Sequence, residues 1–336
     1  MNPSKLHLFI IAILLMVLPL LGGCSAGVSE QSPRAVEGVL DLTEWQPDTG
    51  VVKLDGQWSF YWDQLLDPQE LSDHKPTSAY IDLPGSWNGY QINGSKLPGD
   101  GYATYRLIIK TDTNDRWGLK IPRIFTAYNL WVNNELIAAA GTIGTNRSDV
   151  TPQYLPQVAL FEVQPGENEI VIQVANFYHR SGGVLESLIL GSEEQILSLR
   201  YKSIAYELFL FGSLLIIGLY HLALFIFRKK DYAALYFCLY CLLIAIRTLL
   251  VGERFFIFLY PGFSWEMAHK MQTMTFYLGV PILVMFFKSI FPSHFSTRLL
   301  RIVQVVGFSF AAVVLLTPAR IFSVINPIYQ LFVIVV

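Results

Sequence analysis

Cysteine is scarce in this sequence and is missing from most of it. The three cysteines of the 336 residues are Cys24, Cys238 and Cys241, so the stretch between them at 25–237 cannot form an internal disulfide. A folded domain in that stretch must therefore be stabilised by the burial of apolar side chains alone.

An excess of one charge is also absent. Lys and Arg number 24 against 26 Asp and Glu, which gives a net charge of −2 and argues against nucleic acid as a partner. The sequence has no phosphate-binding loop, nucleophile elbow or zinc-ligand spacing. The acidic residues ahead of the apolar C-terminal part show no pairing of the kind that glycosidases need. We therefore expect no catalytic residue, no metal and no cofactor within this chain. We also expect that the chain itself is not an enzyme.

Long apolar runs, in contrast, fill the C-terminal part of the chain, and the mean hydropathy of +0.42 is unusual for a soluble protein. They predict an all-α transmembrane helix bundle over 196–336 and contact with membrane lipid. The expected spans are 208–227, 233–251, 271–287, 302–316 and 321–336. Cys238 and Cys241 lie in the second of these spans, where we interpret them as small packing residues rather than a metal pair.

Residues 1–24 are typical of a signal segment, with an apolar run that ends in Leu-Gly-Gly-Cys-Ser at 21–25. A cysteine directly after small residues resembles a bacterial lipobox, in which Cys24 would become the lipidated N-terminus. The alternative is an ordinary signal peptide with an incidental cysteine. We expect a linker over 25–45 behind this segment.

Residues 46–195 predict an all-β domain, because short alternating runs are separated by turn formers such as Asp55-Gly56 and Pro165-Gly166. A sandwich or jelly roll buries one side of each such strand. In 126–141 two strands flank a tight turn at Asn133-Asn134. Alternation there sends Leu130 and Val132 into the core, so that Trp131 faces the other way beside polar groups.

An outward aromatic ring beside amide and guanidinium groups is typical of sugar binding. We predict a ligand-binding platform on Trp131, and the alternative is that Trp131 packs under a loop or against the membrane domain. The platform's residues are Asn88, Arg106, Asn129, Trp131, Asn176 and His179.

The order of the β-strand motifs carries a family resemblance. The motifs are DGQWSFYWDQLL (55–66), LPGSWN (83–88), GYATYRLII (101–109), TAYNLWVNNELIAAAG (126–141) and VQPGENEIVIQVANF (163–177). They resemble the jelly-roll, galactose-binding-like domain at the front of β-galactosidase-type glycoside hydrolases. With the spans that follow, the chain resembles bacterial seven-transmembrane receptors with diverse intracellular signalling modules. The resemblance implies an extracellular sensor, a saccharide as a possible ligand, and a cytoplasmic signalling module as partner.

Charge in the loops predicts the orientation of the chain. Six basic residues follow the first and third spans (Arg228, Lys229, Lys230, Lys288, Arg298 and Arg301), whereas only Arg254, Lys270 and Arg320 fall near the other side. By the positive-inside rule the β domain lies outside the cytoplasmic membrane of a bacterium, extracellular or periplasmic. Arg247 and Glu253, at the outer end of the second span, are candidates for coupling the β domain to the helices. Alternatively, Arg247 only anchors its helix at the interface.

The sequence stops at Val336 inside an apolar run, so we expect a truncated record of a longer receptor, with a degenerate remnant as the alternative. The function predicted is a membrane receptor that senses an extracellular ligand. A membrane-anchored carbohydrate-binding or scaffold protein without signalling is the alternative.

Overall fold

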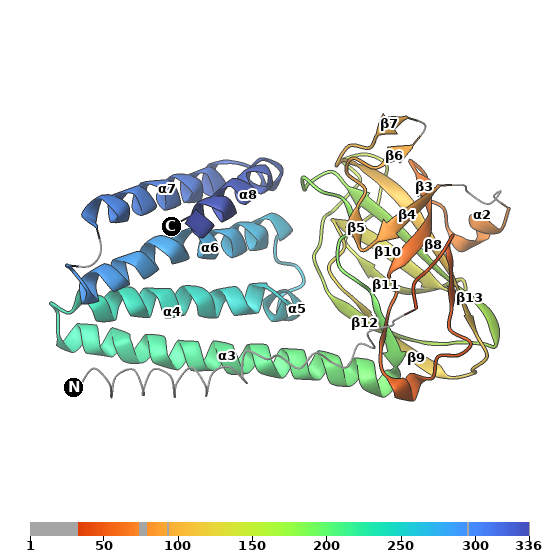
Figure 1. Cartoon of the computed structure of the whole chain (residues 1–336), viewed down its shortest axis with the longest axis horizontal. Helices are drawn as coiled ribbons and strands as arrows, with labels where there is room; N and C mark the ends of the chain where they lie inside the picture. Colours follow the sequence, from red (N-terminus) through yellow and green to blue (C-terminus); the bar gives the residue numbers. More distant parts are fainter. Residues whose placement is uncertain (1–32, 74–78, 93, 294–295, 336) are drawn as a thin grey trace.

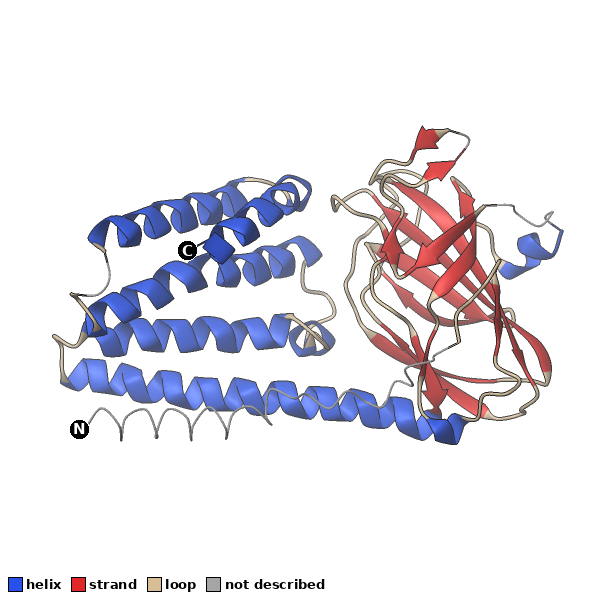
Figure 2. Ribbon diagram, viewed as in Figure 1, coloured by secondary structure: helices blue, strands red, loops and turns tan. Residues whose placement is uncertain are grey.

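The structure is a computed structural model that describes residues 33–73, 79–92, 94–293 and 296–335. The expected signal segment and the lipidation of Cys24 lie outside the described residues and stay predictions. Residues 33–192 form a β-sandwich, called the head below, and residues 193–335 form a group of long helices, called the bundle. Figure 2 shows the two parts side by side, with one long helix running from the head along the bundle.

The head consists of two main β-sheets whose strands are mostly antiparallel. The larger has the strand order β11-β10-β13-β8-β3-β4, with β1 paired parallel to β8. Its bounds are β1 Val39–Asp41, β3 Gly56–Trp62, β4 Tyr80–Leu83, β8 Gly101–Thr111, β10 Ala127–Val132, β11 Glu135–Ala140 and β13 Gly166–Asn176. The smaller has the order β12-β9-β15-β2, from β2 Val52–Lys53, β9 Arg116–Ile121, β12 Gln157–Glu162 and β15 Ile189–Ser192.

Short elements complete the head. Two pairs of two-residue strands lie at its edges: β5 Gly85–Ser86 with β14 Gly183–Val184, and β6 Gln91–Ile92 with β7 Ser95–Lys96. The 3-10 helix η1 spans Pro47–Thr49, and the six-residue helix α2 spans Pro68–Asp73. None of these short strands is predicted by alternation, because two residues do not make a period.

The expected sandwich is confirmed, and the core lies between its two sheets. Its largest buried side chains include Trp58, Trp87, Trp117, Tyr105 and Tyr128, each at most 1% exposed. Leu130 and Val132 point into this core as the alternation predicts. The strands that carry them, β10 and β11, join at Asn133 and Asn134, which both have positive φ angles of 47° and 71°. Asparagine tolerates that conformation better than most residues, which explains the tight turn.

The head begins earlier than expected. Strand β1 and the buried side chains of Leu40 and Leu42 lie within the segment 25–45, where we expect a linker. Three strand residues are too few for a period-2 pattern to stand out, and parallel pairing with β8 supplies the stability that the local sequence lacks.

The bundle consists of α3 Glu193–Phe227, α4 Tyr232–Leu250, the short α5 Phe255–Leu259, α6 Trp265–Ile290, α7 Thr297–Leu316 and α8 Ala319–Val335. Four of the described helices, α3, α4, α6 and α7, are long and apolar enough to cross a membrane, and α8 is a shorter apolar helix. The expected spans fall inside these helices to within a few residues.

Helix α3 joins the two parts without a linker. Ser192 ends β15 and caps α3 through a capping box with Gln195, so strand passes directly into helix. The first turn packs on the head, where the Ile196 side chain is fully buried over Gly118 of β9. At 35 residues, α3 is roughly 50 Å long, so it extends from the head along the whole bundle (Figure 1).

Candidate ligand site between the head and the bundle

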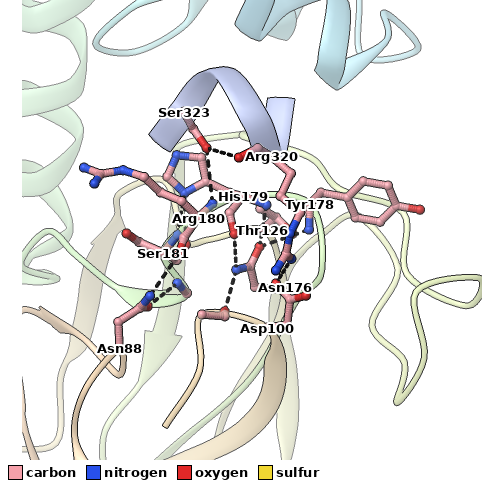
Figure 3. A network of polar contacts seen from close by, with 12 residues as sticks. Asn88, Asp100, Thr126, Asn176, Tyr178, His179, Arg180, Ser181, Arg320 and Ser323 are labelled. Atoms are coloured by element: carbon pink, nitrogen blue, oxygen red, sulfur yellow. Dashed lines mark hydrogen bonds and ion pairs between the residues drawn. The ribbon is translucent and has the colours of Figure 1, made fainter. Parts of the chain in front are cut away.

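A loop of the head that follows β13 faces the helices, and Asn176 fixes its shape. The Asn176 side-chain amide donates hydrogen bonds to the carbonyl oxygens of Gly99 and His179, both at 2.8 Å, and its oxygen accepts one from the His179 N–H at 3.1 Å. Asn88 holds the next part of the loop, because its amide donates to the Arg180 carbonyl at 2.8 Å and its oxygen accepts from the Gly182 N–H. Figure 3 shows this network below α8. Both asparagines therefore position the loop through its backbone.

Glycine is required at the end of this loop. A Cβ on Gly182 would overlap the indole ring of the buried Trp87, and Gly183 has a positive φ of 116°. The loop therefore lies directly against the sandwich core, and the His179 side chain faces the bundle.

Aromatic rings of the head and the bundle pack against each other beyond this loop. His179 lies 4.7 Å from Phe125 and 5.7 Å from His269 of α6, measured between ring centroids. Tyr154 packs edge-on against Trp265 of α6 at 5.2 Å. Phe125 and Tyr154 belong to the same buried cluster as residues of α6, α7 and α8. The two parts thus share one apolar contact region.

Polar contacts surround these rings. Lys120 of β9 forms an ion pair with Glu253, with 2.5 Å between Nζ and Oε1. Asp100 pairs with Arg320 of α8, and the Arg180 N–H donates to the Ser323 hydroxyl at 3.3 Å (Figure 3). The guanidinium of Arg254, 1% exposed, lies over the Tyr154 ring at 5.0 Å. The head is therefore held at several separate points around the end of the bundle.

A cavity of about 360 Å³ lies in the middle of this interface. Its walls come from the head loops and from α4, α6 and α8, and it has the size of a small-molecule site. The lining residues are Arg123, Phe125, His179, Arg180, Ser181, Leu185, Arg247, His269, Gln272, Thr273, Phe276, Phe322, Ser323, Asn326 and Gln330. No Asp or Glu is among these lining residues, as far as the described chain goes.

The electrostatics of the cavity wall follow from burial and from the arginines. The pKa of His179 is lowered to about 4, mainly by burial and also by the charges of Arg180 and Arg123, while the Ser181 carbonyl opposes the shift. His179 is therefore neutral at physiological pH. Burial also lowers the pKa of Arg254 to about 10, which leaves its guanidinium charged at that pH.

The predicted platform residues fall into two groups. Arg106, Asn129 and Trp131 share the face of the larger sheet that points away from the core, since Trp131 and Arg106 both lie opposite Val171 in the strand register. Arg106 forms an ion pair with Glu169, with 2.5 Å between Nε and Oε1. Trp131 is half-buried against a small cluster that includes Leu71 of α2. Asn176 and His179 belong instead to the loop that faces the bundle, and Asn88 is hydrogen-bonded to the backbone of that loop.

The two coupling candidates lie at the head–bundle interface. Glu253 contacts the head through Lys120, and Arg247 lines the cavity, where it donates to the Gln272 carbonyl at 2.9 Å. Whether they transmit a signal stays a prediction. Cys238 and Cys241 are buried free thiols within α4, and no group of metal-ligating side chains forms in the described part of the chain.

Sequence reasoning missed several residues of this interface. Lys120, Arg123 and His269 carry no motif, and their partners are far away along the chain. One signal was present: His269, Gln272 and Asn326 are polar residues in or beside apolar runs, and such residues usually line a cavity or a functional path.

Solved structures of glycoside hydrolases resemble less than half of this chain. A GH2 β-galacturonidase from Eisenbergiella tayi is 14% identical over 42% of this chain and 24% of its own, with a TM-score of 0.31. A β-glucuronidase from Ruminococcus gnavus is 16% identical over 42% of this chain and 28% of its own, with a TM-score of 0.30. The chain thus spans about a quarter of the length of these enzymes. No curated protein matches it.

The bundle matches a family model, described as 7TM diverse intracellular signalling, over residues 203–336. Together with four helices long and apolar enough to cross a membrane, this match makes the chain a multi-pass membrane protein with an N-terminal β-sandwich. Residues 203–336 thus form a membrane domain of the 7TM diverse intracellular signalling family.

Proposed function

We propose that this chain is the sensor and membrane part of a bacterial receptor. In this account a ligand binds outside the cytoplasmic membrane and changes how the head sits on the bundle. The bundle then passes the change to a cytoplasmic signalling module or partner.

One observation carries the proposal: the cavity has walls from both the head and the bundle. A ligand in it contacts the His179 loop on one side and α4, α6 and α8 on the other. Such a ligand has a different affinity for each relative arrangement of the two parts. Differential affinity of this kind is what shifts a conformational equilibrium.

The positions of the basic residues support the proposed orientation. The turn at Arg228–Lys230 joins α3 to α4 at the end of the bundle far from the head, and Lys288 lies near the same end on α6 (Figure 1). The positive-inside rule assigns that end to the cytoplasm, which puts the head outside.

Carbohydrate is the ligand class that the sequence resemblance suggests, and its binding by the head is part of the proposal. The supporting feature is the outer face of the larger sheet, where Arg106, Asn129 and Trp131 lie together. The sheet face proposed for the saccharide and the cavity at the interface are separate sites, so binding at each needs its own test.

The test uses the full chain in lipid nanodiscs. The midpoint of thermal unfolding is first measured in the presence of each of a set of neutral sugars, sugar acids and small organic acids. For each compound that raises the unfolding midpoint, hydrogen exchange of α4, α6 and α8 is measured with and without it. A receptor shows altered exchange in these helices. A binding or scaffold module shows protection in the head alone, and that result contradicts the proposed signalling.

A further inference from the structure

We propose that the cavity between head and bundle binds the anionic group of a small ligand, a carboxylate or a phosphate, through the guanidinium groups on its wall. This inference rests on the proposed function for its role in signalling, and it names the ligand class of the same cavity.

Positive charge on the cavity wall exceeds negative charge. Arg123, Arg180 and Arg247 line it, from two head loops and from α4. Glu186 pairs with Arg123 at 2.6 Å and offsets one of these charges. Among the described residues, neither Arg180 nor Arg247 has a carboxylate partner within ion-pair distance. Two guanidinium groups therefore reach the cavity without a counter-charge.

The charge of Arg247 is costly where it stands. Arg247 is part of the second apolar span, and the contacts of its Nη1 are neutral: the Gln272 carbonyl at 2.9 Å and the Thr275 hydroxyl at 3.5 Å. A partly buried charge without an opposite charge is destabilising. An anion in the cavity would offset that cost, and the planar guanidinium fork suits the two oxygens of a carboxylate or phosphate.

A fourth guanidinium adds to the field from behind the wall. Arg254 donates to the Gln272 side-chain oxygen at 3.0 Å, and its Nε is buried without a hydrogen-bond partner. Gln272 thus connects Arg247 and Arg254, one through its carbonyl and the other through its side chain. Both arginines hold the same stretch of α6 against the cavity.

Neutral polar groups complete the site. Gln272, Thr273, Ser323, Asn326 and Gln330 line the side formed by α6 and α8. The Nδ1 atom of His269 is buried and has no hydrogen-bond partner in the described structure. These groups suit the hydroxyls of a small organic molecule whose anionic group lies at the arginines. A volume of about 360 Å³ is enough for such a molecule.

The first experiment compares a charged and an uncharged probe of similar size. The full chain, in nanodiscs of phosphatidylcholine, is titrated with D-gluconate, inorganic phosphate or D-sorbitol at constant ionic strength, and the unfolding midpoint is followed. We expect gluconate or phosphate to raise the midpoint in a saturable way and sorbitol to leave it unchanged. If no anion exceeds the effect of sodium chloride, the proposal is wrong.

Matched variants locate the effect. Arg247→Gln and, on the rim of the cavity, Arg180→Gln should each weaken binding of the active probe at least tenfold, because each removes a charged hydrogen-bonding partner. Arg180 is exposed and its main-chain contacts do not depend on its side chain, so this variant should fold even where Arg247→Gln does not. Arg301→Gln, an equal change of charge at an exposed position of α7, is the control. Equal weakening in all three variants would mean unspecific attraction and would overturn the site.

Nanodiscs that contain phosphatidylglycerol separate the two sources of the anionic group. If the lipid headgroup occupies the site, these discs raise the midpoint of the wild type but not of Arg180→Gln, and they reduce the response to soluble anions. If the ligand is a soluble molecule, the response to gluconate or phosphate is the same in both discs.

Failure of this inference is distinguishable from failure of the proposed function. Saturable anion binding without a change in hydrogen exchange of α4, α6 and α8 supports the site and contradicts signalling. Altered exchange with a neutral sugar alone supports signalling and contradicts the anion site.

Discussion

Lys120 of the head and Glu253 of the bundle form an ion pair of 2.5 Å, although 133 positions separate them in the sequence. Glu253 lies in the turn that follows α4, and its own N–H donates to the Glu207 carboxylate of α3 at 3.0 Å. Lys120 of β9 thus pairs with Glu253, which in turn contacts the Glu207 carboxylate of α3. This contact fixes the head against the bundle on the side of the interface away from α8.

The two ends of this ion pair should respond unequally to mutation. Lys120→Met leaves two neighbouring carboxylates without their cation, whereas Glu253→Gln leaves the lysine beside Glu207. Losing one partner costs about 3 to 5 kcal/mol for a fully buried pair and about 1 kcal/mol or less at the surface. We expect about 2 kcal/mol for Lys120→Met in chemical unfolding of the full chain, and clearly less for Glu253→Gln. Equal effects of the two variants would argue against a shared cation.

Gly252 should tolerate no side chain. Its φ is +67°, and a Cβ there would overlap the Glu207 carboxylate. We expect Gly252→Ala to displace that carboxylate and to lower the unfolding midpoint by several degrees. Gly262→Ala, where a Cβ would meet open space, serves as the control. If both variants melt like the wild type, the turn after α4 is not packed as described.

The neutral state of His179 predicts a pH dependence of stability. Its pKa is about 4 in the folded protein, against about 6.5 in an unfolded chain, so the unfolded state binds more protons between these values. The groups that face it are Arg123, Arg180 and His269. His179 therefore contributes to the free energy of unfolding in full above pH 6.5. This contribution, about 3 kcal/mol, is lost as the pH falls towards 4.

Replacement of this histidine tests the pH argument. We expect His179→Gln to flatten the acid side of the midpoint-against-pH curve between pH 6.5 and 4. His221→Gln, on α3, should leave that slope unchanged. A wild-type slope in His179→Gln would mean that the ring already carries a proton in the folded protein.

Substitutions of Trp131 distinguish a packing role of its ring from a role in ligand binding. Because the ring is half-buried against the Leu71 cluster, we expect Trp131→Ala to cost about 1 to 3 kcal/mol of folding stability, less than the 3 to 5 kcal/mol of a fully buried ring. Trp131→Phe should restore most of that stability. If a saccharide binds this face, Trp131→Ala should also weaken it by about 1 to 3 kcal/mol. Unchanged saccharide affinity would remove Trp131 from the platform.

Local patterns predicted much of the fold. Asn133 and Asn134 mark a turn because few residues accept positive φ, and Leu130 and Val132 alternate because a strand has a period of two. The helices of the bundle follow from runs of apolar residues that need no partner to be recognised. Strand β1 was missed because its stability comes from pairing with β8, and not from its own three residues.

The site was harder to predict, since its residues converge only in three dimensions. Arg247 and Glu253 stood out because charge is unusual near a span. His179 was predicted to bind sugar because it lies in a loop with other polar residues. In the structure its ring contacts Phe125 and His269. Whether Trp131 would be covered depended on α2, which is about 60 positions away in the sequence and leaves no trace in the alternation of β10.

The most direct measurement of the central claim is the distance between head and bundle. Spin labels at Glu167→Cys on β13 and Lys230→Cys beyond α3 report it in nanodiscs, with the buried Cys238 and Cys241 replaced by alanine. We predict one narrow distance distribution for the otherwise wild-type chain, because Lys120, Asp100 and the aromatic rings hold the two parts together. The distribution should broaden when Lys120→Met and Arg320→Gln are combined. A broad distribution that these changes leave unaltered would mean that the head is only tethered, and it would contradict a receptor that couples the two parts.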